Sequence, residues 1–337
     1  MTQLENDFKI VWVEVGRPIP GYAIRNFKLT NKMHGSVKQY LFTDSSKSLH
    51  FMRTLAESEI PKSAKTKEFL EIRKEWNFRQ QYFWLGTTKR FFHLYDLMTY
   101  LNLQNVVHLE TDSILLETKP LREFFGNQSY VDMAYPLQAH KLGCASILLL
   151  RSSEILGTFL DYIIANWKRD NVNDMTLLGT YLPRRGVMAL PTWPTSRSVN
   201  YFYDAVTIGK YFQGSDARNC KFPLSQRGLM EHQEGSIYEN IGSLNYSWIT
   251  KSINKNISIE IEIDDNKAKL VNLHLHSKHI SKSILFMKII IKLGFSENKS
   301  FIWRAGLFDW LVFFERTVSF FNRRILRNNK YEEKNLR

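Results

Sequence analysis

Near-continuous apolar runs alternate along this chain with longer stretches of helical periodicity, and this alternation limits the possible folds more than any other feature. The runs lack polar alternation, so each indicates a strand that is covered on both faces. Strands that alternate with helices favour an α/β fold with a mostly parallel sheet flanked by helices. The predicted strands are residues 8–15, 38–43, 106–109 and 144–150. The predicted helices are residues 21–34, 65–83, a segment from Thr87 or Thr88 to residue 101, and residues 153–167 and 174–182.

Composition sets the class of protein. With 337 residues and 44% hydrophobic residues, the chain can bury a sizeable core as one large domain with an appendage or as two modest domains. Two cysteines, Cys144 and Cys220, are too few for a disulfide framework or a thiolate zinc site, and they favour a reducing compartment. We find no signal-peptide pattern and no apolar stretch of about 18 residues. We therefore expect a cytoplasmic protein.

Positive charge gathers near the C-terminus. Residues 278–337 carry a net +8 of the total +13, together with apolar runs at 283–295 and 307–326. In the second run, apolar residues recur at intervals of three and four with arginines beside them, which predicts an amphipathic helix. Such a helix suits an anionic membrane surface, and we expect residues 283–327 to lie on the inner face of the membrane. Packing on its own domain or in a homodimer is the alternative, and nucleic-acid binding is disfavoured.

Two acidic residues directly follow a predicted strand. Glu110 and Asp112 come after VVHL and would project to the same side if the chain stays extended. In parallel α/β sheets, ligands bind outside the carboxyl ends of the strands. Two carboxylates there suit a hard divalent cation such as Mg²⁺ or Mn²⁺ that bridges phosphate oxygens. A simple turn acid at a strand end is the structural alternative.

A second polar group lies far along the chain. In LVNLHLHSK, residues 270–278, polar and apolar residues alternate, so that Asn272, His274 and His276 share one face of a predicted strand. One imidazole could reach a metal ion while the other contacts a phosphate or a sugar hydroxyl, and Lys278 follows immediately. The alternative is a half-exposed strand whose polar residues face solvent.

The order of these motifs resembles that of bacterial GT-A glycosyltransferases that build surface polysaccharide or lipid-linked glycans. The resemblance runs over residues 8–280, so it implies a catalytic domain at 1–280 and a separate tail at 281–337. The segments that carry it are YLFTD, RFFHLYDLM, NVVHLETDSILL, NDMTLL, YDAVTIGKYFQGSDARN and VNLHLHSK.

The resemblance implies a metal-dependent enzyme. Glu110 and Asp112 match the acid-x-acid motif that holds Mn²⁺ or Mg²⁺, with Glu in place of the usual first Asp, and His274 or His276 would complete the shell. An inverting enzyme also needs a carboxylate as base, for which Asp174 is the first candidate before Asp204 and Asp216. The expected contacts to the nucleotide-sugar donor are Val13, Glu14, Gly16, Arg17, Thr43, Asp44, Arg90, Thr111 and Lys278.

Other functions stay open at this point. The same site would serve a metal-dependent hydrolase or phosphotransferase of nucleotide sugars, and a non-catalytic glycan- or membrane-binding scaffold is the third possibility. The chain has no GxxxxGK phosphate loop and no nucleophile-elbow sequence. Residues 189–204 form either a platform for the glycan or lipid-linked acceptor or a packed loop. His93 and His108 sit beside apolar runs and are expected in the core.

Overall fold

The described part of the molecule covers most of the predicted catalytic region. The computed structural model describes residues 8–45, 48–72, 81–167, 172–192, 200–209, 246–253, 256–263 and 266–275. The predicted tail at 281–337, with its amphipathic helix, lies outside the described residues, so the division at residue 280 and the membrane contact stay predictions. Asp216, His276 and Lys278 also lie outside them.

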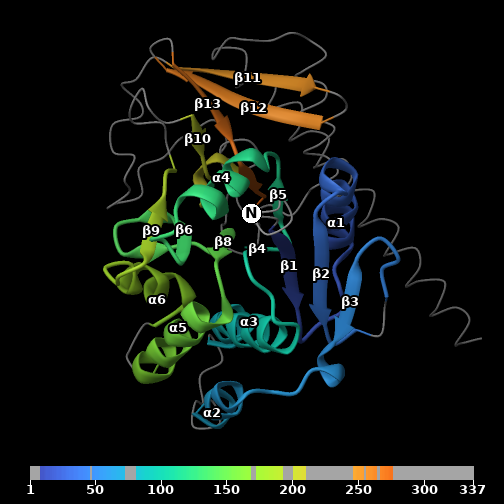
Figure 1. Cartoon of the computed structure of the whole chain (residues 1–337), viewed down its shortest axis with the longest axis vertical. Helices are drawn as coiled ribbons and strands as arrows, with labels where there is room; N and C mark the ends of the chain where they lie inside the picture. The colour runs from blue at the N-terminus through green and yellow to red at the C-terminus, as the bar shows by residue number, and fades with distance from the viewer. Residues whose placement is uncertain are drawn as a thin grey trace, which may run out of the picture.

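An eight-stranded sheet forms the centre of the fold (Figure 1). Its strands are β1 (Lys9–Glu14), β2 (Lys38–Thr43), β3 (Arg53–Ala56), β4 (Val106–Leu109), β6 (Met133–Ala139), β7 (Leu142–Gly143), β8 (Ile147–Leu150) and β9 (Val187–Leu190). They follow the order β3-β2-β1-β4-β8-β6-β7, with β9 paired to β6. The pairs from β3 to β4 and the β6–β9 pair are parallel, whereas β4–β8, β8–β6 and β6–β7 are antiparallel.

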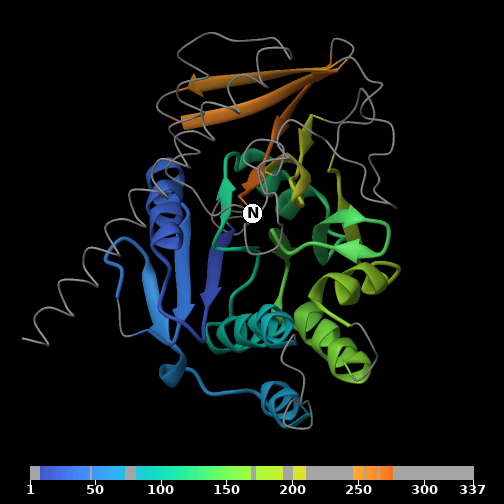
Figure 2. The same ribbon diagram turned by 180° about the vertical axis from the view of Figure 1, so that it is seen from behind.

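Two smaller sheets complete the strand framework. A four-stranded sheet contains β10 (Tyr201–Phe202), β13 (Asn266–Leu270), β12 (Asn256–Ile263) and β11 (Tyr246–Ile253) in that order. It lies at one end of the main sheet, at the top of Figures 1 and 2. A two-stranded sheet pairs β5 (Ser113–Leu115) with β14 (Asn272–His274) in antiparallel fashion.

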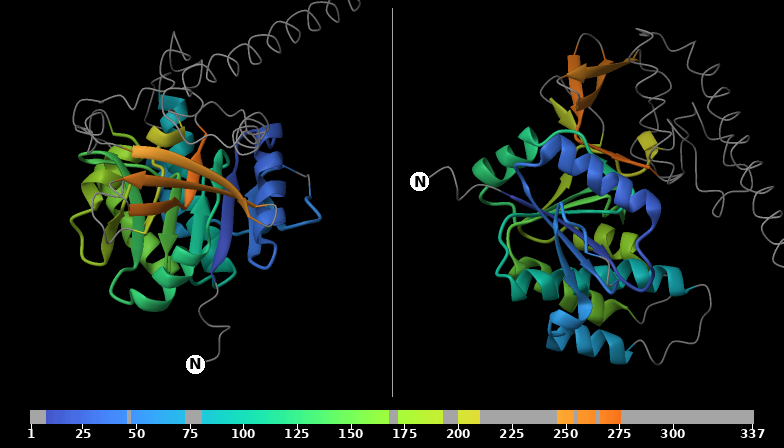
Figure 3. Two further views of the ribbon diagram at one scale, coloured as in Figure 1. Left: turned by 90° about the horizontal axis from the view of Figure 1, so that it is seen from above. Right: turned by 90° about the vertical axis from the view of Figure 1, so that its right-hand side faces the viewer.

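Helices cover both faces of the main sheet (Figure 3). They are α1 (Gly21–His34), α2 (Ala64–Ile72), α3 (Gln81–Tyr100), α4 (Lys119–Asn127), α5 (Ser153–Asn166) and α6 (Asp174–Tyr181), with a short 3₁₀ turn η1 (Glu57–Glu59). One core contains Val11 of β1 with residues of α2, α3, α5 and α6. The other contains Trp12 of β1 with residues of α1 and α4. Successive residues of β1 therefore bury opposite faces, which is why its sequence is apolar without alternation.

The predicted fold class is confirmed, with three local differences. The helix expected from Thr87 or Thr88 begins at Gln81, and Thr88 is buried inside it. The sheet also contains antiparallel strands, because β8 runs antiparallel to both of its neighbours, β4 and β6. The strand expected over 270–278 is divided: β13 ends at Leu270 and β14 begins at Asn272, and the two pair with different sheets. No helix in the described ranges is long and apolar enough to cross a membrane.

His93 and His108 lie in the core, as expected, since each is 1% exposed. His93 of α3 packs its ring 5.2 Å from that of Phe42. Burial, helped by Lys89 and Lys62, lowers the pKa of His93 to about 3. The folded state therefore resists a proton that the unfolded chain accepts near pH 6.5.

We expect this histidine to make the fold sensitive to acid. Above about pH 6.5 His93 is neutral in both the folded and the unfolded chain, so it costs no stability. As the pH falls from there towards 3, the free energy of unfolding decreases by about 1.4 kcal/mol per pH unit, because the unfolded chain alone takes up the proton. Denaturant unfolding at about pH 7 and about pH 5 should show wild type losing about 2 kcal/mol more than His93→Leu. Equal losses in the two proteins would contradict this prediction.

Candidate functional site

The acidic segment after β4 is a turn. The Ser113 N–H donates to the Glu110 carbonyl at 2.9 Å, so the extended conformation that we predicted for Glu110 and Asp112 is wrong. The two carboxylates still converge, because the turn brings both within reach of the same imidazole on β14. Parallel β1, β2 and β4 all end at this edge of the sheet, where α/β proteins bind ligands.

A buried asparagine on α1 holds this turn in place. The Asn26 side-chain amide donates to the carbonyls of Thr111, at 3.2 Å, and Ser113, at 2.7 Å. These two carbonyls flank Asp112, so Asn26 orients the residue between them. Asn26 was not among the site residues predicted from the sequence. Asn26 gave no distinct local signal, because the buried face of α1 also carries Thr30 and His34, and its partners lie 85 and 87 residues away.

Strand β14 carries His274 to the acidic turn. His274 lies opposite Ser113 in the β14–β5 ladder, and the Leu275 N–H donates to the Asp112 carbonyl at 2.8 Å. Asn272 and His274 are both buried, so the alternative of a half-exposed strand with these two side chains in water is excluded. The Asn272 side chain forms hydrogen bonds with the backbone of Asp204 and with the Ser113 hydroxyl, so these groups occupy the amide that we predicted on the ligand-binding face.

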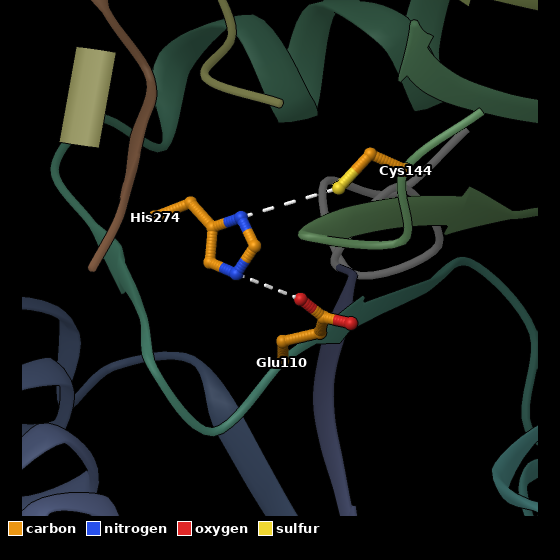
Figure 4. Close-up of side chains that lie close together, drawn as sticks. All are labelled: Glu110, Cys144 and His274. Carbon is orange, nitrogen blue, oxygen red and sulfur yellow. Dashed lines mark hydrogen bonds and ion pairs between the residues drawn. The ribbon is translucent and has the colours of Figure 1, made fainter. Parts of the chain in front are cut away.

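The His274 ring lies between two kinds of partner (Figure 4). Its Nε2 is 2.9 Å from Glu110 Oε2 and 3.5 Å from Asp112 Oδ1. Its Nδ1 is 2.5 Å from the Ala205 carbonyl and 4.0 Å from the Cys144 sulfur. A carbonyl oxygen has no proton to donate, so Nδ1 is the donor in this hydrogen bond, and this orients Nε2 towards the carboxylates.

Arg90 of α3 connects this cluster to the start of α6. Its guanidinium forms ion pairs with Glu110 and, at 2.8 Å, with Asp174. The Arg90 side chain is 13% exposed and that of Asp174 is 5% exposed. Asn173 caps α6 through the Thr176 N–H, so Asp174 is not needed as the cap. In this arrangement Arg90 binds protein carboxylates, and a phosphate would have to compete with them.

Burial and charge act in opposite directions on these groups. Burial alone would raise the pKa of Glu110 and lower that of His274, but Arg90 and His274 hold the pKa of Glu110 well below its usual range. Glu110 and Asp112 raise the pKa of His274 well above its own. Burial raises the pKa of Asp174, partly opposed by Arg90. With Asp112, the cluster contains three acidic and two basic side chains, so it has an excess of negative charge.

The Asp204 carboxylate binds backbone N–H groups. Its carboxylate accepts the N–H groups of Ile208, Gly209 and His274 at 2.8–3.0 Å. Burial raises the pKa of Asp204 to about 6, against the lowering effect of His274. With three backbone donors on its two oxygens, the carboxylate holds β14 against residues 204–209. Of the two candidate bases within the described residues, Asp174 is therefore the better placed.

Gly209 packs directly against the backbone of β14. A Cβ at Gly209 would lie 1.7 Å from the His274 carbonyl oxygen. We expect Gly209→Ala to displace β14, to cost roughly 1–3 kcal/mol of stability and to weaken cation binding. Unfolding and Mn²⁺ titration would measure both effects. Gly86→Ala in α3 is the matched control because nothing lies within 4 Å of its Cβ, and it should be neutral or slightly stabilising. Equal behaviour of the two variants would contradict the prediction.

The proposed donor residues lie at the neighbouring strand ends. Gly16 has a φ of +92° and donates its N–H to Asp44 at 2.8 Å, which joins the ends of β1 and β2. Arg17 pairs with Glu14 at 2.5 Å and reaches the Tyr22 hydroxyl at 3.3 Å. Of the other proposed contacts, Val13 and Thr43 are buried at the ends of their strands and Thr111 is buried in the acidic turn.

Tyr22, at the start of α1, links these residues to the acidic turn. Burial raises the pKa of its phenol, and the charge of Asp112 raises it further. Neither Tyr22 nor Cys144 was among the site residues predicted from the sequence. The structure thus brings Glu110, Asp112, His274, Arg90 and Asp174 into one cluster and places the strand-end residues beside it.

The donor set of this cluster suits a hard divalent cation. Two carboxylates and one imidazole nitrogen point at one another, and His274 bonds a backbone carbonyl through its other nitrogen, as metal-ligating histidines do. Glu110, Asp112 and His274 would hold Mn²⁺ or Mg²⁺, with phosphate oxygens or water as further ligands.

Comparisons with known proteins return solved structures alone. No protein-family profile and no curated protein matches the sequence. The chain is similar to the PaToxG glycosyltransferase, with 13% identity and a TM-score of 0.34 over 50% of this chain and 63% of that one. It is similar to mouse xyloside xylosyltransferase 1, with 9% identity and a TM-score of 0.38 over 58% and 88% of the two chains. It is also similar to an active-site mutant of LgtC, with 12% identity and a TM-score of 0.36 over 58% and 75%. Likenesses at this level carry no argument about activity.

Proposed function

We propose that this protein is a metal-dependent glycosyltransferase that moves a sugar from a nucleotide-sugar donor to a glycan or lipid-linked acceptor. One observation carries the proposal: Glu110, Asp112 and His274 Nε2 converge at the carboxyl edge of parallel strands, beside a buried Arg90–Asp174 pair. This geometry supports a diphosphate-bound cation at the cluster and, next to it, a charged pair that would contact the reacting sugar.

The cation would supply positive charge to the departing diphosphate as the bond to the sugar breaks. The chain's own residues set the geometry. Asn26 holds the acidic turn, and Asp204 fixes the backbone of His274. The nucleotide would lie over the ends of β1 and β2, where Gly16 and Asp44 close the loop and Tyr22 borders Asp112. Lys278 stays a proposed phosphate contact, and Asp216 and His276 stay proposed site residues.

Asp174 is the carboxylate best placed to act on the acceptor or on the transferred sugar. It starts α6, is buried, and is oriented by Arg90, which also contacts Glu110. In an inverting reaction it would accept the proton of the attacking hydroxyl. In a retaining reaction it would instead position the sugar through hydrogen bonds.

The experiment is a thermal-shift screen of nucleotide sugars with and without Mn²⁺, followed by product analysis of every hit. A donor that binds the folded state raises the unfolding midpoint. A hit that requires the cation, with sugar transferred to an acceptor, supports the proposal. Release of free sugar alone would indicate a hydrolase. Transfer of phosphate would indicate a phosphotransferase, and no nucleotide-sugar binding would indicate the scaffold.

A role in surface polysaccharide assembly at the membrane is part of the same proposal. It rests on the basic, aromatic segment at 283–327, whose composition suits an anionic lipid surface. Dimerisation through that segment stays the alternative.

A further inference from the structure

A thiol lies against the cation-binding cluster. Cys144 follows β7 and precedes β8, is 5% exposed, and donates to the Ala205 carbonyl at 3.0 Å. The same carbonyl contacts His274 Nδ1, and the sulfur lies 4.0 Å from that nitrogen. The hard-cation shell proposed above does not use this sulfur. The two cysteines are too few for a zinc site made of thiolates, but a site of mixed ligands needs just one.

Glu110, Cys144 and His274 also form a compact set of ligand atoms (Figure 4). One carboxylate oxygen, the sulfur and one ring nitrogen all lie within 4.8 Å of one another. In a tetrahedral zinc site with bonds of about 2.0–2.3 Å, neighbouring ligand atoms are roughly 3.5 Å apart. A movement of about 1 Å by side chains would therefore close these three around an ion.

We propose that Glu110, Cys144 and one ring nitrogen of His274 form a site for a thiophilic divalent cation such as Zn²⁺, and that this ion excludes the hard cation. Exclusion follows because both ions need Glu110 and His274. Zn²⁺ binds most protein ligands more tightly than Mn²⁺ does, and a thiolate ligand increases this difference in affinity. The thiol proton leaves to solvent when the metal–sulfur bond forms. Zinc would thus inhibit at low concentration, a consequence that rests on the proposed function, whereas the site itself does not.

Co²⁺ is the direct probe, because a cobalt–thiolate bond gives an intense near-ultraviolet charge-transfer band that oxygen and nitrogen ligands do not give. The chain has two cysteines, so Cys220→Ser leaves Cys144 as the one thiol. We expect the full-length Cys220→Ser protein to show the band with one equivalent of Co²⁺. His274→Gln in the same background should abolish it. No band in Cys220→Ser, or a band that survives His274→Gln, overturns the proposal.

Zn²⁺ affinity gives a second measurement. Cys144→Ser keeps a donor for the Ala205 carbonyl, so the local fold should persist. It should weaken Zn²⁺ binding by more than the roughly 10–100-fold that an outer-sphere partner contributes, with Mn²⁺ binding retained. Equal Zn²⁺ affinity in the two proteins would contradict the thiolate ligand. If Cys144→Ser does not fold, the cobalt band of Cys220→Ser decides the question by itself.

Displacement of Mn²⁺, followed by its paramagnetic resonance, tests exclusion. One equivalent of Zn²⁺ should release the bound Mn²⁺, whereas Mn²⁺ that stays bound beside zinc overturns exclusion. A cobalt–thiolate band in a protein that binds no Mn²⁺ and transfers no sugar would support the thiolate site and overturn the proposed function. Mn²⁺-dependent sugar transfer without the cobalt–thiolate band would support the proposed function and overturn the thiolate site.

Discussion

Asp112→Asn is expected to reduce cation-dependent transfer by at least roughly 10²–10³-fold while the protein stays folded. The Asp112 side chain is 13% exposed and lies 3.5 Å from His274 Nε2, where it is one of the three proposed cation ligands. Asparagine has nearly the same shape but no negative charge, so it is a much poorer ligand for a hard cation. The Asp112 carbonyl, which accepts the Leu275 N–H, is unchanged by the substitution.

Three measurements check this prediction: turnover with saturating donor, Mn²⁺ affinity, and the unfolding midpoint. Asp161→Asn is the matched control, because that carboxylate is 59% exposed on α5 and pairs with Lys65. It should leave turnover and Mn²⁺ affinity unchanged. Normal turnover in Asp112→Asn would rule out the metal role, and the proposed function would lose its main support.

Arg90→Met is expected to lower the free energy of unfolding by roughly 3–5 kcal/mol. Arg90 is the shared partner of Glu110 and Asp174, and all three side chains are at most 15% exposed. Methionine fills similar space but leaves the buried Glu110 and Asp174 carboxylates without the guanidinium that contacts both. Removal of one partner from a buried ion pair costs far more than replacement of the whole pair.

A double-mutant cycle separates this effect from lost packing. Asp174→Asn in the Arg90→Met background removes one of the two carboxylate charges that lost the guanidinium, so part of the lost stability should return. Arg90→Lys should lie between wild type and Arg90→Met, because an ammonium keeps the charge but lacks the planar fork that binds two carboxylates. Denaturant unfolding of wild type, the single variants Arg90→Met and Asp174→Asn, and the double variant measures the coupling. A loss below about 1 kcal/mol in Arg90→Met would show that the pair is not a buried network.

Much of the fold was predictable because its signals are local. The apolar runs at β1, β2, β4 and β8 report burial on both faces, and that property belongs to each short segment by itself. The helix over 174–182 was equally predictable, since Asn173 caps it through a residue three positions away. The start of α3 was predicted too late because a cap-like threonine inside a helix has the same local pattern as a true cap.

The candidate site was predictable in part. Glu110, Asp112 and His274 were named from strand-end position and alternation, and they meet in the structure. The alternation over 270–278 predicted one strand, whereas the backbone breaks at Val271 and changes sheets. Asp204 was named as a candidate base, but its oxygens accept backbone N–H groups from Ile208, Gly209 and His274. The sequence alone does not distinguish an aspartate that binds the backbone from one that faces a ligand, because the difference depends on distant contacts.

The order of strands and helices, and the carboxylates at the end of β4, were determined by the sequence itself, because hydrophobic periodicity acts over a few residues. Tertiary structure alone decided that Arg90 pairs with Asp174, 84 positions away, and that Cys144 lies beside His274, 130 positions away. Such contacts depend on which strands become neighbours and in what register, and that choice is a property of the whole packed core.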